Sequence, residues 1–288
     1  MKIVKDFSDY KILDMSNGKK LEQWGDYILN RPDPSIIWNK EINNELWASA
    51  DATYERSSSG GGNWQNVTKK MPDSWIISYD DLKFNLKLMG FKHTGLFPEQ
   101  AVNWRLIKEI IKNANREVKV LNLFAYTGAA SIAALSEGAS VVHVDSSKGM
   151  IEWAKENVKV NGLNDKPIRF IVDDVIKFVK REKRRGNKYD IIIMDPPTFG
   201  RGTSGEIWNL EDNLFDLVNE CSNLLTDDAL LFLINSYTTG VPKTILENIL
   251  QLAVNEKISG SIESYELGLP MKDSNLVLPC GMSAKWTR

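Results

Sequence analysis

Apolar residues follow two different patterns along the chain, and the change between them lies near residue 90. Residues 1–90 contain short runs rich in β-branched and aromatic residues, which favour strands. In residues 91–288, apolar runs of strand length alternate with stretches whose apolar residues recur at helical spacing. The sequence therefore predicts a small antiparallel β unit in residues 1–90 and an α/β domain in residues 91–288.

The strands expected in residues 1–90 are separated by turn-forming sequences. They are expected at residues 26–29, 48–54, 75–79 and 83–88. Asp80 and Asp81 are expected to form a hairpin turn between the last two of them. Residues 57–62, S-S-S-G-G-G, are expected to form a flexible loop.

In residues 91–288 the alternation of strands and helices predicts a doubly wound, mostly parallel sheet. One strand is expected to begin at residue 118, and the others are expected at residues 140–144, 168–172, 189–194 and 229–234. One helix is expected to begin at residue 129, and the others are expected at residues 98–113, 148–161, 175–184, 210–225 and 243–254. Two final strands, 261–267 and 276–279, have no helix between them, which predicts one antiparallel edge strand.

Residues 118–128, V-K-V-L-N-L-F-A-Y-T-G, organise the predicted site. A strand that stops at a glycine turn and leads into a helix points backbone N–H groups at a ligand. Asp145 ends the next strand, where an acid can accept hydrogen bonds from ribose hydroxyls. Because the turn is not G-x-G-x-x-G, a nucleoside cofactor without a closely bound pyrophosphate is favoured, such as S-adenosylmethionine (SAM). The alternative is an ordinary buried turn with a chance aspartate.

Two further acidic positions follow strands of the predicted sheet. Asp195 is followed by Pro196 and Pro197, which fix the backbone and hold the loop rigidly at the carboxyl edge of the sheet. We interpret this D-P-P loop as catalytic, because methyl transfer requires a positioned acceptor. Asp173 and Asp174 follow the third strand; Asp174 is the preferred acceptor for the adenine amino group, and a helix N-cap is its alternative role.

Composition and charge limit the partners. The net charge is −2, so RNA would have to be held by a local patch. A basic run lies at residues 180–185, but cations also suit the end of a helix, and a solvated helix end is favoured. Two cysteines, Cys221 and Cys280, are too few for a disulfide framework or a zinc site, so we expect a reducing cytosol and no metal. No apolar stretch has the length of a signal peptide or a membrane span.

Five motifs resemble those of the bacterial large-subunit ribosomal RNA methyltransferases, which are SAM-dependent. The motifs are L-K-F-N (82–85), H-T-G-L-F-P-E-Q (93–100), L-N-L-F-A-Y-T-G (121–128), V-D-S-S (144–147) and D-P-P-T-F (195–199). The resemblance covers residues 82–288. It implies a Rossmann-like class I methyltransferase fold, SAM as cofactor and RNA as partner.

The resemblance also implies roles for individual residues. Residues 93–100 would fold over SAM, residues 124–128 would contact its methionine end, and the acid at 145 would hold the ribose. The predicted cofactor-binding residues are His93, Thr94, Phe97, Gln100, Phe124, Ala125, Tyr126, Thr127, Gly128, Asp145, Ser146, Asp173 and Asp174. The predicted catalytic residues are Asp195, Pro196 and Pro197.

Two departures from the family pattern bear on the substrate. Members that methylate carbon-5 of cytosine carry a nucleophilic cysteine after the fifth strand, where this chain has Ser236 and Tyr237. A hydroxyl without a base is a poor nucleophile, so no covalent intermediate is expected. Members that methylate nitrogen-7 of guanine are more similar at D-P-P-T-F and carry Asn in the later segment. Residues 1–81 resemble neither a PUA-type nor a THUMP-type RNA-binding domain, so RNA rests on the resemblance alone.

The sequence thus predicts a cytoplasmic SAM-dependent methyltransferase that acts on RNA, with ribosomal RNA as the implied target. Three alternatives stay open: a methyltransferase for a protein or small molecule, a SAM-binding protein without activity, and a nucleotide-binding oxidoreductase. The absent G-x-G-x-x-G and the D-P-P loop argue against the last of these.

Overall fold

The computed structural model describes residues 1–41, 44–57, 61–201, 207–238 and 240–288. The chain forms two compact units, each described by itself. The large unit comprises Met1–Lys2, Val102–Leu267 and Cys280–Arg288, and the small unit comprises Ile3–Ala101 and Gly268–Pro279. The division at residue 90 expected from the sequence stays a prediction.

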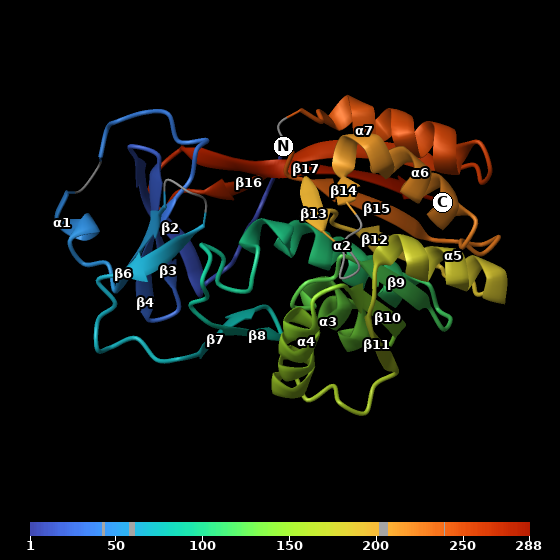
Figure 1. Cartoon of the computed structure of the whole chain (residues 1–288), viewed down its shortest axis with the longest axis horizontal. Coiled ribbons are helices and arrows are strands. Elements are labelled where there is room, and N and C mark those ends of the chain that lie inside the picture. Colours follow the sequence, from blue (N-terminus) through green and yellow to red (C-terminus); the bar gives the residue numbers. More distant parts are fainter. Residues whose placement is uncertain (42–43, 58–60, 202–206, 239) are drawn as a thin grey trace. The chain divides into compact units, whose positions relative to one another are not determined.

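The main sheet has eight strands in the order β1-β16-β17-β15-β12-β9-β10-β11 (Figure 1). Their bounds are β1 Lys2–Ile3, β9 Lys119–Leu123, β10 Ser140–Asp145, β11 Ile168–Val172, β12 Ile191–Met194, β15 Leu231–Ser236, β16 Ser261–Pro270 and β17 Val277–Thr287. Strands β15, β12, β9, β10 and β11 are parallel to their neighbours in this series. The prediction of a doubly wound, mostly parallel sheet is confirmed.

Helices lie on both faces of this sheet. Figure 1 shows α5, α6 and α7 on one side and α3 and α4 on the other. The helices are α2 Ala101–Asn113, which a 3₁₀ turn at Pro98–Gln100 precedes, α3 Ala129–Ser136, α4 Lys148–Val160, α5 Val175–Arg185, α6 Leu210–Ser222 and α7 Lys243–Leu250, which a π-turn at Gln251–Asn255 follows. One buried core joins the sheet to α5–α7 through side chains such as Leu121, Phe178, Leu217 and Leu246.

The register of the parallel strands places their carboxyl ends at one level. Leu123 at the end of β9 is paired with Val144 of β10 and with Met194 of β12. The residues that follow these three positions, Phe124, Asp145 and Asp195, therefore meet at the same edge of the sheet. Ligands bind at this edge in open α/β folds, so the fold itself assembles the predicted site.

The small unit contains a five-stranded sheet in the order β2-β3-β4-β5-β6 and a separate hairpin, β7–β8. Their bounds are β2 Tyr10–Ser16, β3 Lys19–Trp24, β4 Tyr27–Pro32, β5 Ala52–Arg56, β6 Gly62–Gln65, β7 Trp75–Tyr79 and β8 Leu82–Leu86. The expected hairpin turn at Asp80–Asp81 is confirmed. Residues 58–60 of the predicted loop at 57–62 lie outside the described ranges, and Gly62 begins β6.

Several details of the small unit differ from the expectation, among them the unpredicted strand β6. The sequence did not predict β2 and β3, which flank the turn at Asn17–Gly18. The expected strand 48–54 starts only at Ala52, because the short helix α1, Asn44–Trp47, precedes it.

Two other differences lie in the large unit. A hairpin of β13, Phe199–Arg201, and β14, Ile207–Asn209, follows the D-P-P loop. The antiparallel strand β17 is not at the edge of the sheet, because β16 and β1 lie beyond it. Among the described residues, no helix has the length and apolar character needed to cross a membrane.

Candidate active site

The turn at residues 124–128 combines unusual backbone geometry with a carboxylate anchor. Phe124, Tyr126 and Gly128 have positive φ angles of 53°, 51° and 90°. A left-handed conformation costs a residue other than glycine about 1–2 kcal/mol, so the two aromatic residues must be held in place. The backbone N–H of Tyr126 donates to Asp145 Oδ2 at 2.9 Å. Backbone strain that is held by surrounding contacts is characteristic of ligand-binding turns.

Asp145 binds backbone groups with both carboxylate oxygens. Oδ1 accepts from the N–H of Ser147 at 2.8 Å, while Oδ2 accepts from Tyr126. Burial raises the pKa of Asp145, and these two hydrogen bonds offset part of that rise. Each oxygen keeps a further lone pair. A desolvated acceptor with free lone pairs suits the two hydroxyl donors of a ribose, so the residue fits the nucleoside part of SAM.

A network of buried polar side chains adjoins the turn, and the sequence did not predict it. Asn122 donates to Ser131 Oγ at 2.9 Å, and Ser131 Oγ lies 2.9 Å from Nδ1 of His143. Burial lowers the pKa of His143 to about 3, so its ring is neutral at pH 7. A Cβ added at Gly128 would lie 3.2 Å from the Cβ of Ala154 and 3.4 Å from His143 Cε1. Glycine at 128 is therefore favoured by its φ angle and by the close approach of Ala154 on α4.

The acids after β11 are already engaged in the protein. The N–H of Asp173 donates to the backbone oxygen of Asp145 at 3.1 Å, and its carboxylate pairs with Arg181. Asp174 caps α5 by accepting from the N–H of Lys177 at 2.9 Å, so the alternative N-cap role is confirmed. The contact of either acid with adenine stays a prediction.

The D-P-P loop is fixed by hydrogen bonds on both sides. The N–H of Asp195 donates to Leu123 O at 3.4 Å, which ties the start of the loop to β9. The indole N–H of Trp208 donates to Pro197 O at 2.6 Å. Thr198 Oγ1 lies 2.7 Å from Thr238 Oγ1. The loop cannot shift relative to the strand ends without breaking these contacts.

Trp208 contacts both the D-P-P loop and the turn at residues 124–128, which we call the cofactor turn. It lies on β14, and its ring packs against Phe124 with centroids 5.2 Å apart. Its indole N–H holds Pro197, and the side chain is buried. The sequence offered no signal for this role, because the contact depends on the hairpin β13–β14. Trp208 therefore sets the spacing between the turn and the loop.

The predicted site residues divide between the two units. The large unit brings together residues 124–128, Asp145, Ser146, Asp173 and Asp195. His93, Thr94, Phe97 and Gln100 belong to the small unit.

Within the small unit, the rings of His93 and Phe97 lie 5.0 Å apart. Thr94 is fully buried, and its hydroxyl has no hydrogen-bond partner among the described residues. An orphaned hydroxyl of this kind fits a polar group of a ligand.

Cys221 lies in the interior, whereas the segment after β15 begins at the same edge as Asp195, because Ile234 is paired with Met194. Cys221 is fully buried on α6, and burial raises the pKa of its thiol. Cys280 is half-buried on β17. Asn235 is buried, and its side-chain oxygen accepts from Asn103 and Ser283 at 3.0 and 2.7 Å. Asn235 is thus part of an interior network of the large unit.

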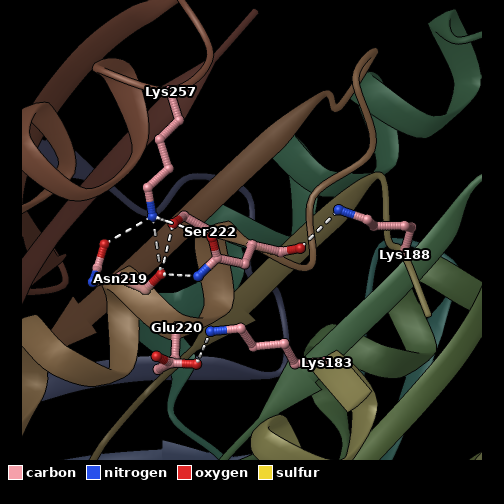
Figure 2. A network of polar contacts seen from close by, with 7 residues as sticks. Lys183, Lys188, Asn219, Glu220, Ser222 and Lys257 are labelled. Carbon is pink, nitrogen blue, oxygen red and sulfur yellow. Dashed lines mark hydrogen bonds and ion pairs between the residues drawn. The ribbon is translucent and has the colours of Figure 1, made fainter. Parts of the chain in front are cut away.

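Three cations of the basic run of α5, Arg181, Lys183 and Arg185, form ion pairs within the large unit. Arg181 pairs with Asp173, and Lys183 Nζ lies 2.9 Å from Glu220. Figure 2 shows Lys183 beside two other lysines, Lys188 and Lys257, which contact the last turn of α6. Cations suit the carbonyl end of a helix. These contacts support the interpretation of the run as a solvated helix end.

The fold and this edge define a Rossmann-like protein that holds a nucleoside-bearing cofactor. A model of the S-adenosylmethionine-dependent methyltransferase family matches residues 54–264, and the chain belongs to this family. The predicted enzyme class, fold and cofactor SAM are thereby confirmed. In the described ranges, no group of three or more His, Cys, Asp or Glu side chains could hold a metal ion.

Solved structures agree with this assignment. A SAM-dependent methyltransferase from Agrobacterium tumefaciens is 36% identical, with a TM-score of 0.93 over 99% of this chain and 92% of that chain. A putative SAM-dependent methyltransferase from Streptococcus mutans is 19% identical, with a TM-score of 0.74 over 98% of this chain and 76% of that chain, and shows the same fold.

Curated relatives carry a more specific name. The chain is 34% identical over 186 residues to the ribosomal RNA large subunit methyltransferase K/L of Shewanella frigidimarina. The match covers 64% of this chain but 25% of that protein. The corresponding protein of Shewanella baltica is 38% identical over 60% of this chain and 23% of its own length. The chain thus spans about a quarter of these relatives.

We expect Asp145→Ala to weaken SAM binding. It removes a charge-assisted acceptor worth roughly 1.5–3 kcal/mol, which corresponds to about tenfold to a hundredfold in affinity. Calorimetric titration measures the change, with Asp216→Ala on the exposed side of α6 as a control. Unchanged SAM affinity, or equally tight binding of NAD by the wild type, would contradict the assignment of this acid.

We expect Trp208→Phe to lower the rate of methyl transfer about three- to tenfold while SAM affinity changes less than about twofold. The phenyl ring keeps packing against Phe124, but the hydrogen bond to Pro197, worth about 1 kcal/mol, is lost. Single-turnover rates and calorimetry separate the two effects. Trp208→Ala should be worse in both, because it also removes the ring. A Phe variant with the wild-type rate would show that the hydrogen bond does not position the loop.

Proposed function

We propose that the protein methylates a base of RNA, with ribosomal RNA as the target, and that no cysteine becomes covalently attached to the substrate. The observation that carries the proposal is the rigid D-P-P loop, tied to the end of β9 at Leu123 and to the cofactor turn through Trp208. The names of the curated relatives support RNA as the substrate class.

The residues of the large unit divide the work of the reaction. SAM supplies an electrophilic methyl group when it is bound. Asp145 orients the ribose, and residues 124–128 face the methionine end. Asp195, with its backbone fixed by two prolines, accepts a hydrogen bond from the substrate base and aims the acceptor atom. Proximity and alignment are the main contributions that such a site can make to a direct displacement.

The surroundings of Cys221 and Ser236 support a reaction without a covalent step. Burial disfavours the thiolate of Cys221, and only a thiolate is an effective nucleophile. Ser236 stands where the resemblance places the nucleophilic cysteine; it is buried and accepts from the N–H of Thr238 at 3.3 Å. A ring nitrogen has its own lone pair and needs no enzyme nucleophile, so a nitrogen of a purine is the favoured acceptor.

A protein or small-molecule acceptor is the second candidate. The net charge of −2 favours it, because the chain as a whole does not attract polyanions. The third candidate is SAM binding without activity. All three candidates share the cofactor site, and they differ only in what accepts the methyl group.

Transfer of labelled methyl from SAM into fractionated RNA and protein distinguishes the candidates. We expect label in large-subunit ribosomal RNA and none in the protein fraction. RNA from cells that lack the gene is the acceptor of choice, because its target base is unmodified. Label in protein alone would reject RNA in favour of a protein acceptor. Label in neither fraction would also reject RNA, and would leave a small-molecule acceptor or SAM binding without activity.

We expect Asp195→Ala to reduce the single-turnover rate by about a hundredfold with little change in SAM affinity, and Asp195→Asn to be milder. Asparagine keeps the size and an acceptor oxygen, which is what orientation requires. The rate of the wild type should vary little between about pH 6 and 9. If Asp195 were a general base, Asn would be as damaging as Ala and the wild-type rate would fall steeply at low pH.

A further inference from the structure

One face of the small unit carries a group of cations. Lys20 on β3 and Arg31 on β4 are directly paired across the antiparallel ladder. Side chains alternate along a strand, so Arg56 lies on the same side of the sheet as Ala52 of β5. Ala52 is paired with Leu29 of β4, and Leu29 lies on the same side as Arg31. Arg56 and Arg31 therefore share one side of the sheet. The backbone oxygen of Lys92 accepts from Arg31 Nη1 at 3.0 Å, which brings residue 92 to this group. We call Lys20, Arg31, Arg56 and Lys92 the cationic face.

Two acids of the small unit, Glu22 and Asp33, are paired with Arg31 and Lys20. Glu22 is fully buried and accepts from Arg31 Nε and Nη2 at 2.5 and 2.8 Å. Burial alone would raise the pKa of Glu22, but Arg31 and Lys20 lower it to about 2. Asp33 lies 3.2 Å from Lys20 Nζ. Lys92 and Arg56 form no ion pair with any described residue.

The charged form of Lys92 is therefore disfavoured by its surroundings. Its side chain is half-buried. Burial lowers the pKa of its ammonium group to about 8, and Lys20, Arg31 and Arg56 contribute while only Asp33 opposes them. An ammonium group that is partly desolvated among like charges destabilises the fold unless an anion joins it. Groups held in this way mark binding sites more often than structural ones.

The partner that satisfies this arrangement is a phosphate. Arginine offers a planar fork that matches phosphate oxygens, and lysine offers a compact charge. Arg56 is exposed and Lys92 is half-buried, so a ligand can reach both. The adjacent Phe91 is 37% exposed and lies 6.3 Å from the His93 ring between centroids. An exposed aromatic beside a cation is the usual composition of sites that bind single-stranded nucleic acid, where bases stack and phosphates pair.

We propose that Lys92 and Arg56 form a phosphate-binding site for the backbone of the RNA substrate. The inference rests on the proposed function and adds to it the surface that holds the RNA. It also accounts for binding of a polyanion by a chain with net negative charge, because the contact comes from one local group of cations.

The test uses the full chain with the variants Lys92→Gln, Arg56→Gln and their combination. Lys69→Gln is the matched control, since Lys69 is an exposed lysine of the small unit. Binding of transcribed large-subunit ribosomal RNA is measured over a series of salt concentrations. Each variant should weaken binding several-fold and lower the slope of log K against log salt by about 0.7–0.9. The control should change neither, and SAM affinity should stay within about twofold in all proteins.

A thermal melt separates binding from a structural role. Lys92→Gln should keep or raise the melting temperature, because it removes an unpaired cation from a positive environment. A drop of several degrees would mark a structural lysine and overturn the inference. The double variant could bind RNA with unchanged affinity and salt slope while the wild type methylates RNA. That result would overturn the phosphate site and leave the proposed function intact. Wild-type protein that neither binds nor methylates RNA would overturn both.

Discussion

The hydrogen bond from the Tyr126 N–H to the carboxylate of Asp145 is the interaction on which the active edge depends. It joins the end of β9 to the end of β10, and the register of these strands allows it because Leu123 and Val144 are paired. The same carboxylate holds the N–H of Ser147, the N-cap of α4. One acid thus fixes the cofactor turn and the start of the next helix while it keeps lone pairs for a ligand.

The strain in the turn has a structural reason. Phe124 and Tyr126 adopt left-handed conformations, which are unfavourable in an isolated peptide. These conformations are held by the aligned ends of the strands, by the network of Ser131 and His143, and by the ring of Trp208. A turn held in this way is organised before the ligand arrives, so less binding energy is lost in ordering it.

The sequence predicts those parts of the structure that depend on local patterns. Apolar runs and helical spacing predicted the parallel strands, and the D-P-P motif and the acid at 145 identified the edge. Residues whose role comes from contacts distant in sequence were missed: His143 interrupts an apolar strand, and Trp208 acts through a hairpin that pairs only three residues of each strand. Strand β3 was not predicted, because the acid Glu22 within this segment suggested that it is exposed to solvent. Glu22 can be buried because Arg31 and the hydroxyl of Tyr10 donate to its carboxylate.

Acidic residues gather at the edge of the large unit and cations gather on one face of the small unit, and this difference has a consequence for an RNA substrate. The edge of the large unit presents Asp145, Asp173, Asp174 and Asp195 near the ends of its strands. Such carboxylates attract hydroxyl and amino donors of nucleosides and bases, but they repel phosphates within about a Debye length, roughly 8 Å at physiological salt. A base can enter this edge, whereas its backbone needs cations elsewhere. In the small unit the acids Glu22 and Asp33 are already paired, which leaves Lys92 and Arg56 to meet that need.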